Sequence, residues 1–212
     1  MAKTLGCLGI IGVALAVLGL YLAGQYNGLV RQQQTVEAQW AQVENVYQRR
    51  ADLVPNLVAT VKGAADFEQE TLDRVVQARS RVGQISAQAT QSIINDPQKL
   101  AQFEAAQDGL SSALSRLLVV VERYPELKSV ATFQDLMTQL EGTENRIAVE
   151  RRRFNDTARE FNTRLKAVPT RWFIDLLNWD FQEKAYFQAQ AGAEQAPAVK
   201  FDFGSNGTEQ TQ

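Results

Sequence analysis

Two arginines and one glutamate stand where the surrounding sequence is otherwise apolar and helical in pattern. Arg50 interrupts an apolar stripe over residues 29–62. Arg79 interrupts a second stripe over residues 66–89, and Glu144 fills a gap in a third. Because a guanidinium binds carboxylates and other anions through a rigid fork of N–H donors, these residue types indicate an internal ionic cluster or an anion pocket.

The heights of the three residues support a shared layer, provided that consecutive helices run antiparallel. Each lies roughly 12 residues from one end of its predicted helix, the end farther from the N-terminus of the chain when the helices are packed side by side; this is a rise of about 18 Å. We call this end of the helices the distal end. We therefore expect an ionic cluster of Arg50, Arg79 and Glu144, joined by Asn145 or Asp52, that fixes the register of the helices. A functional polar pocket at this layer is the alternative.

Composition excludes several kinds of chemistry. The 212 residues include no histidine, which removes the commonest general base near neutral pH and the Glu-x-x-His pairs of di-iron bundles. Cys7 is the only cysteine, so intrachain disulfides and thiolate clusters are excluded. No phosphate-binding loop or nucleophile motif occurs. We expect no catalytic residue, cofactor or metal, and the net charge of −2 predicts no nucleic-acid partner.

Three consecutive arginines, Arg151 to Arg153, form a basic run. A helix directs consecutive residues to different faces, and Glu150 and Asp156 lie close by in the sequence. We interpret the run as a solvated face of mixed charge rather than as a binding patch.

The elements that must position these side chains are predicted to be helices. Glycine and proline are sparse, at 13 and 5 residues, and alternating strand-like runs are absent. Apolar residues at steps of three and four predict four long helices, at 29–62, 66–89, 97–124 and 132–168. Short connections favour an all-α, antiparallel up-and-down four-helix bundle. Pro55 is predicted to kink or locally break the first helix.

An apolar segment precedes these helices. Leu5–Ala23 holds 19 residues without a charge. As a helix it spans about 28 Å, close to the hydrocarbon thickness of a bilayer. We predict an uncleaved transmembrane anchor, with a cleavable signal peptide as the alternative. The chain then divides into a short N-terminus, an anchor, a bundle and a flexible tail, at residues 1–4, 5–25, 26–187 and 188–212.

The orientation of this anchor is predicted from few charges. Lys3 and the amino terminus precede the span, whereas Arg31 is the nearest cation after it. The positive-inside rule slightly favours a cytoplasmic N-terminus and a body on the exported side.

The segment 169–187 is rich in aromatic residues. It should lie at the membrane-proximal end, because the fourth helix ends there. We predict Trp172, Phe173, Trp179 and Phe181 at this end. They either cap the base of the bundle or enter the membrane interface, where tryptophan is favoured.

Several longer motifs resemble one known family. They are YNGLV at 26–30, Trp40, RRADLVPNLVATVKG at 49–63, ERYPELK at 122–128, Phe-x-x-Leu at 133–136, TENRI at 143–147, RRRFND at 151–156 and FN at 161–162. Together they make the chain similar to the LemA family over nearly its whole length. The resemblance implies a single-pass protein of the bacterial inner membrane with a bromodomain-like four-helix bundle and no established molecular function. Family members are described with a short extracellular N-terminus, opposite to the charge bias at Lys3.

We expect a membrane-anchored scaffold or interaction module that is not an enzyme. Its expected partners are the lipid bilayer, further copies of itself and another membrane protein. Gly12, Ala16 and Gly19 lie near one face and would let two anchors pack closely. Two alternatives stay open: a membrane-shaping protein that inserts its aromatic base into one leaflet, and a small-anion receptor or hydrolase that uses the Arg/Glu layer.

If the bundle binds a partner through residues of its own, we expect the contact at its distal end. The residues concerned are Pro55, Asn56, Glu122, Tyr124 and Pro125.

Overall fold

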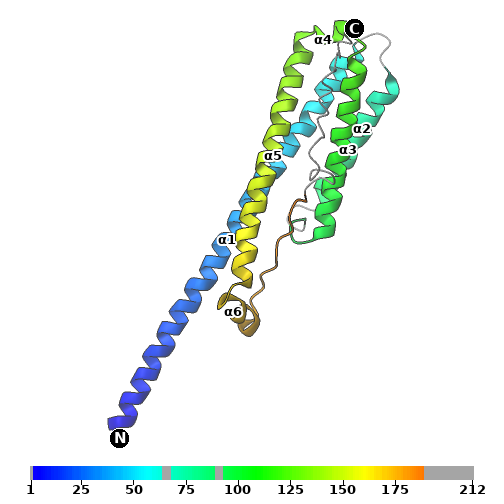
Figure 1. Ribbon diagram of the computed structural model, residues 1–212. Coiled ribbons are helices and arrows are strands. Elements are labelled where there is room, and N and C mark those ends of the chain that lie inside the picture. The colour runs from blue at the N-terminus through cyan, green and yellow to red at the C-terminus, as the bar shows by residue number, and fades with distance from the viewer. Residues whose placement is uncertain (1, 64–67, 89–92, 189–212) are drawn as a thin grey trace, which may run out of the picture.

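The computed structural model describes residues 2–63, 68–88 and 93–188. Within these ranges the chain is helical and has no strand (Figure 1), which confirms the all-α part of the predicted fold class. The helices are α1 (Ala2–Lys62), α2 (Gln69–Gln88), α3 (Pro97–Val121), α4 (Pro125–Lys128), α5 (Ala131–Lys166) and α6 (Thr170–Leu177).

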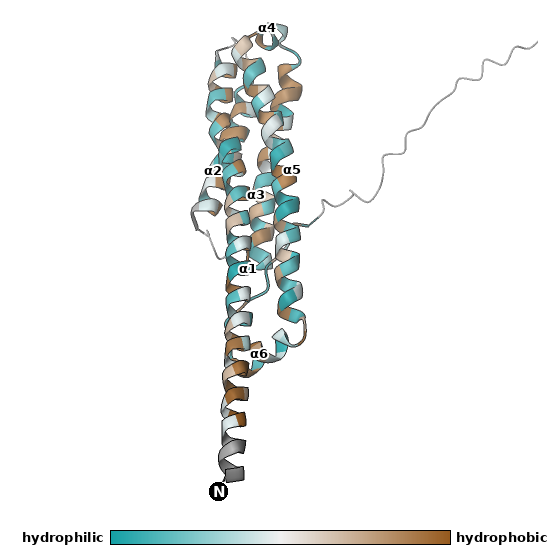
Figure 2. Ribbon diagram, turned by 90° about the vertical axis from the view of Figure 1, so that its left-hand side faces the viewer, coloured by the Kyte–Doolittle hydropathy of each residue, from teal (hydrophilic) through white to brown (hydrophobic). Residues whose placement is uncertain are grey.

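The apolar N-terminal segment and the first helix of the body form one element. α1 is a single helix of 61 residues, and Pro55 lies inside it without ending it. The predicted local break at Pro55 is therefore wrong. Residues 9–20 of α1 stand clear of the other helices, and this stretch is mostly apolar (Figure 2). An unbroken helix carries this apolar stretch directly into the packed body.

The upper part of α1 packs lengthwise against α5, and α2 packs lengthwise against α3. In both ribbon views these four long helices lie side by side, while the short α4 crosses the distal end and α6 lies at the opposite end of the body (Figures 1 and 2). The predicted helices 66–89, 97–124 and 132–168 correspond to α2, α3 and α5, with ends that differ by a few residues. The predicted helix 29–62 corresponds to the upper part of α1, which begins at Ala2.

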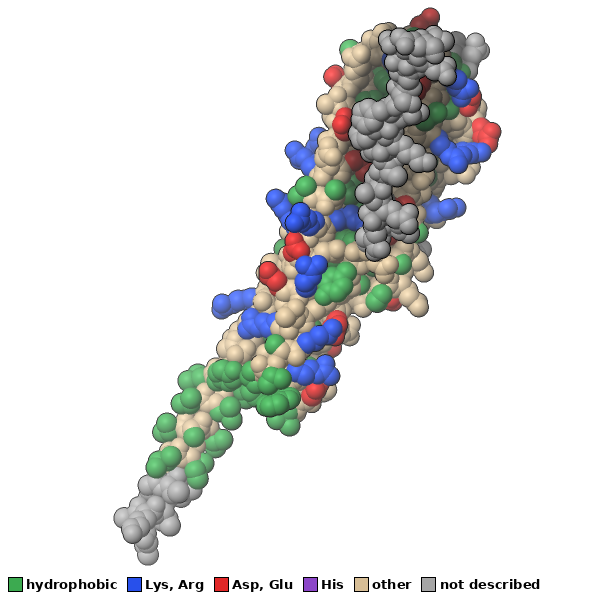
Figure 3. All heavy atoms as spheres, viewed as in Figure 1, with side chains coloured by type: hydrophobic (Ala, Val, Ile, Leu, Met, Phe, Trp, Pro, Cys, Tyr) green, Lys and Arg blue, Asp and Glu red, His purple; other side chains and the backbone are tan. Residues whose placement is uncertain are grey.

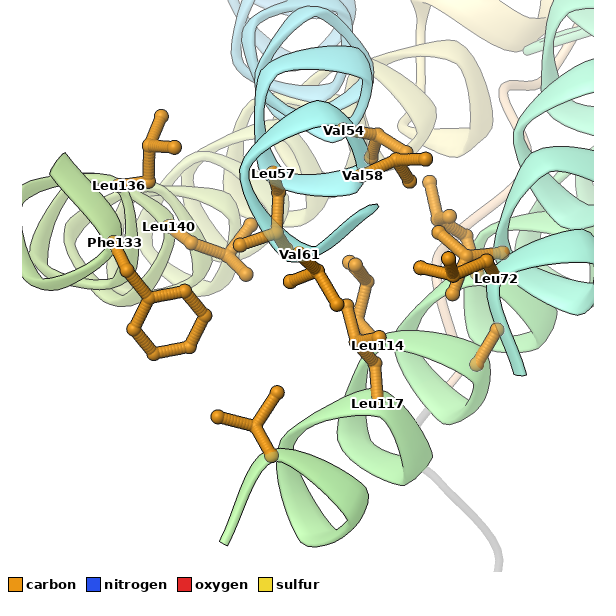
Figure 4. Close-up of a cluster of buried hydrophobic side chains, with 14 of the residues drawn as sticks. Val54, Leu57, Val58, Val61, Leu72, Leu114, Leu117, Phe133, Leu136 and Leu140 are labelled. Atoms are coloured by element: carbon orange, nitrogen blue, oxygen red, sulfur yellow. The ribbon is translucent and has the colours of Figure 1, made fainter. Parts of the chain in front are cut away.

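Two apolar clusters fill the body, one above the other. The distal cluster includes Val54, Leu57, Leu114 and Leu140, which come from α1, α3 and α5 and point toward one another (Figure 4). The proximal cluster is richer in aromatic residues, and it includes the buried side chains of Trp40, Phe103, Phe154, Phe161 and Phe187. Along α1 and α5, the boundary between the clusters falls at the turns that hold the ionic layer.

Residues 178–188 return along the body as an extended segment after α6. Asn178 adopts the left-handed conformation, with φ of 51°, and ends α6. Further along, the Ala185 backbone N–H donates to the Ile94 carbonyl at 2.8 Å, and Phe187 is buried in the proximal cluster. The expectation that the whole segment 169–187 lies at the base is therefore wrong for its last residues. Of the predicted tail, 188–212, all but the first residue lies outside the described residues.

Candidate functional site

Arg50 lies on α1 between the two apolar clusters, and only 1% of the residue is exposed. Its Nη1 donates to Glu144 Oε1 on α5 and to Ser111 Oγ on α3, both at 2.8 Å. Its Nη2 donates to the backbone and side-chain oxygens of Gln107 on α3. The ring of Tyr47 lies 5.1 Å from the guanidinium carbon. One side chain therefore joins three helices at a single height.

The two charges of this layer differ in their access to water. The Glu144 side chain is 40% exposed, whereas that of Arg50 is 2% exposed. Glu144 therefore keeps part of its hydration, and the desolvation cost falls mainly on Arg50. The oxygens of Gln107 and Ser111 offset this cost by accepting charge-assisted hydrogen bonds. Asn145 and Asp52, which were expected to join the layer, are exposed instead, and Asp52 accepts from Gln48.

Arg79 does not join the layer, and its predicted place in the cluster is wrong. Its side chain is exposed on α2, and Nε donates to the Ala51 carbonyl at 2.9 Å. Proline has no N–H, so Pro55 cannot bond this carbonyl, which lies four residues before it in the helix. Arg79 therefore supplies the donor that Pro55 lacks, which helps α1 to continue through the proline.

A surface groove of about 730 Å³ opens beside the layer. Its charged lining residues are Arg50, Arg151, Arg152, Arg159, Asp108, Glu144 and Asp156. Three carboxylates thus balance most of the four guanidiniums. Arg50 is bonded to one of these carboxylates, Glu144, at 2.8 Å, and Arg151 is bonded to a further one, Glu104, at 2.5 Å. The groove therefore does not concentrate the positive potential that a receptor for small anions would use.

Arg151 makes a second ionic contact between helices, which the sequence interpretation missed. Its Nη2 lies 2.5 Å from Glu104 Oε1 on α3, and the two side chains are only 20% and 14% exposed. Its guanidinium carbon also lies 4.5 Å from the centre of the Phe187 ring. Burial raises the pKa of Glu104, an effect that the Arg151 charge opposes. The basic run is thus not a uniformly solvated face: Arg152 and Arg153 are exposed, whereas Arg151 is half-buried.

Two asparagines on α5 hold the backbone of the returning segment. Asn162 donates from Nδ2 to the Lys184 carbonyl and accepts the Lys184 N–H at Oδ1, both at 2.8 Å. Asn155 makes the same pair of bonds with Phe187, both at 2.9 Å. The signal for this arrangement is the dipeptide Phe-Asn at 154–155 and again seven residues later. In each copy the phenylalanine enters the proximal cluster and the asparagine binds the segment.

The same segment buries Lys184, of which 4% is exposed. Its Nζ donates to Asn95 Oδ1 at 2.6 Å and lies 5.7 Å from the centre of the Phe161 ring. Burial lowers the pKa of Lys184 below its ordinary value of 10.5, and the charge of Glu37 opposes the shift. The amide oxygen and the ring thus partly compensate an amine that has lost its hydration.

The predicted aromatic residues at the base divide into two groups. Phe173 meets Tyr21 of α1 edge-on at 6.1 Å between ring centroids. Trp179 and Phe181 contact Tyr26 of α1 at 5.2 and 5.6 Å and pack against the proximal cluster. Trp172, in contrast, is 65% exposed. The base is therefore capped by some of its aromatic residues but not by all of them.

The residues of the predicted distal surface do not form one site. Pro55, Asn56, Glu122 and Pro125 are exposed, whereas Tyr124 is half-buried against the distal cluster. Glu122 lies 3.8 Å from Lys128, a weak surface ion pair. The cavity found at this end is lined by other residues, which belong to α2, α3 and the turn before α2. These positions remain a prediction.

Two observations on the described residues bear on the class of protein. One helix, α1, contains a stretch that is long and apolar enough to cross a membrane, and that stretch is not buried inside the structure. No group of three or more Asp, Glu, Cys or His side chains among the described residues is arranged to hold a metal ion.

Comparison with known proteins gives one family and several relatives. The model of the LemA family matches residues 39–201. The chain is 28% identical over 178 residues to magnetosome protein MamQ 2 of Paramagnetospirillum magneticum, across 77% of this chain and 65% of that protein. It is 27% identical over 194 residues to magnetosome protein MamQ of Magnetospirillum gryphiswaldense, across 82% of this chain and 71% of the relative. It is 25% identical over 166 residues to protein LemA of Metamycoplasma hominis, across 78% and 70% of the two chains.

Proposed function

Because this chain belongs to the LemA family, we propose that it is a single-span membrane protein whose helical body acts as an interaction module and not as an enzyme. One observation carries the proposal: α1 runs as one helix from an uncovered apolar stretch into the core of the body. Among the described residues of that stretch, the large apolar side chains that are exposed include Ile10, Ile11, Val13, Leu15, Val17, Leu18 and Leu20. Exposing this apolar surface to water would cost free energy, whereas contact with the lipid chains of a bilayer removes that cost.

We further propose that α1, α2, α3 and α5 form an antiparallel, bromodomain-like bundle that stands on the inner membrane of a bacterium. The short connections and the lengthwise packing of α1 on α5 and of α2 on α3 support this arrangement. The charges at Lys3 and Arg31 favour a body on the exported side. The unbroken α1 leaves no flexible stalk between the membrane and the body.

Self-association in the membrane is the form of interaction that we propose first. An added Cβ at Gly12 or at Gly19 meets no atom within 4 Å in this chain. The backbone is therefore free to approach a second helix closely at both positions, which is how small residues favour helix pairs in lipid. MamQ 2 is a magnetosome protein by name, and this chain covers 65% of its length. The name of that relative does not identify the biological process in which this chain takes part.

Sizing of the full chain in a mild detergent tests this proposal. We expect a protein mass well above the 23.6 kDa of one chain. Replacing Gly12 and Gly19 by isoleucine should reduce that mass, because the larger side chains separate the anchors. The matched control replaces Val13 and Val17 by isoleucine, which adds bulk to the same span away from these glycines. A single-chain mass for the unaltered protein would contradict self-association.

A further inference from the structure

The base of the body carries apolar side chains that no described part of the chain covers. On α6, Trp172 is 65% exposed, Leu176 is 79% exposed and Leu177 is 43% exposed. A single exposed apolar residue is ordinary, but a group of them at one end of a molecule marks a contact surface. In the space-filling view, hydrophobic side chains at the base continue onto the lower part of α1 (Figure 3).

Ring contacts fix the height of α6 along α1. Phe173 of α6 meets Tyr21, and Trp179, just beyond α6, meets Tyr26. Tyr21 stands two residues before the end of the uncharged stretch Leu5–Ala23, a rise of about 3 Å. If that stretch crosses the hydrocarbon layer, α6 lies where hydrocarbon gives way to headgroups. This is the depth at which tyrosine and tryptophan are favoured.

α6 presents different residues to the body and to its surroundings. Ile174 packs against the proximal cluster, and Thr170 is buried. Trp172 and Leu176, which are four residues apart and hence on one face, are exposed. Arg171 and Asp175 form an exposed ion pair of 2.9 Å between them along the helix. This combination of a tryptophan, leucines and flanking charges is typical of a helix that lies in a membrane interface.

We propose that α6 is a second membrane-contacting element, whose exposed face places Trp172 and Leu176 in the interfacial layer of the bilayer that α1 crosses. The inference rests on the proposed function, because α6 reaches lipid at this depth only when α1 is inserted. The exposed apolar surface of α6 is continuous with that of α1, and this is why we assign lipid as the molecule that covers α6. A protein that covered α6 from below would have to fill the space around the span. With two attachment points, the body is held at one depth and one tilt.

Depth-dependent quenching of tryptophan fluorescence tests this inference on the full chain. The protein is reconstituted in phosphatidylcholine vesicles whose acyl chains are brominated close to the headgroups. Subtracting the emission of Trp172→Phe from that of the unaltered protein isolates the contribution of Trp172. We expect bromolipid to remove most of this contribution and aqueous iodide to remove little of it. Trp179→Phe, the matched control, should leave the contribution of Trp172 unchanged, because Trp179 packs against Tyr26.

The outcomes separate the inference from the proposal on which it rests. Protein that fails to float with the vesicles overturns the single-span proposal, and the inference with it. Protein that floats while iodide quenches Trp172 and bromolipid does not overturns the inference alone, because α6 then lies in water. Floating protein in which neither agent quenches Trp172 also overturns it, because a protein surface then covers α6.

Discussion

Replacing Arg50 by alanine should lower the free energy of unfolding by about 3 kcal/mol, the lower end of the range for breaking a buried ion pair. The substitution leaves the oxygens of Gln107 and Ser111 on α3 without the Arg50 donor. It also removes the side chain of a residue that is only 1% exposed. The loss stays at the lower end because Glu144, at 40% side-chain exposure, can be hydrated by water. Urea unfolding followed by circular dichroism measures the change.

Arg49→Ala is the matched control for this substitution. Arg49 precedes Arg50 on the same helix and is exposed. We expect its loss to change the unfolding free energy by less than about 0.5 kcal/mol, as at most surface positions. Equal effects of the two substitutions would mean that Arg50 does not hold the three helices together.

A double substitution, Arg50→Met with Glu144→Met, separates stability from register in the same experiment. Replacing both charges by apolar side chains removes the desolvation cost together with the attraction, and such replacements are often neutral or stabilising. We therefore expect the double variant to recover much of the stability that Arg50→Ala loses. If the charged layer fixes the register of the helices, the double variant should sample more than one register. The amide exchange rates of residues around Gln107 should then be less uniform than in the unaltered protein.

Replacing Asn162 by alanine is expected to have the second large effect. Asn162 is 3% exposed, and it binds both the N–H and the carbonyl of Lys184. Each buried backbone group left without a partner costs about 1–3 kcal/mol. Because these bonds hold residues 178–188 on the body, the segment should separate from α5 more often. Hydrogen exchange should then accelerate at the Lys184 and Phe187 amides before it does so at residues within α5.

Asn145→Ala is the control for this prediction. Asn145 lies on the same helix and is exposed. Its substitution removes the same side-chain amide as Asn162→Ala does. It should leave amide exchange in the returning segment unchanged. Unchanged exchange at Lys184 in Asn162→Ala would instead show that the aromatic contacts of Phe187 hold the segment without the asparagine.

The sequence predicts those features of this protein that follow from helical periodicity. Apolar spacing located the four long helices, and the uncharged stretch located the candidate span. Counting residues from the helix ends placed Arg50 and Glu144 at one height, where they are bonded. The same count failed for Arg79, because height along a helix does not specify the direction in which a side chain points. Arg79 points to the backbone of α1 beside Pro55.

The path of the returning segment could not be predicted from the periodicity of the sequence. Residues 178–188 adopt no regular helix or strand, so no repeating pattern identifies their path. Their position depends on hydrogen bonds from Asn155 and Asn162, which lie 32 and 22 residues before their partners Phe187 and Lys184. The repeated Phe-Asn pair is visible in the sequence, but its meaning requires knowing what packs against α5. The contact of Arg151 with Glu104 likewise depends on the packing of α5 beside α3.

The most direct test of the central claim is whether the full chain remains in membranes after an alkaline carbonate wash and flotation. Insertion of α1 predicts that the unaltered protein floats with the vesicles after the wash. Leu15→Arg with Leu18→Arg should abolish this, because an arginine at the centre of a span costs roughly 2.5–3.5 kcal/mol. The control, Leu15→Ile with Leu18→Ile, should float as the unaltered protein does. Release of the unaltered protein by the wash would contradict the account, because attachment through α6 alone would not survive it.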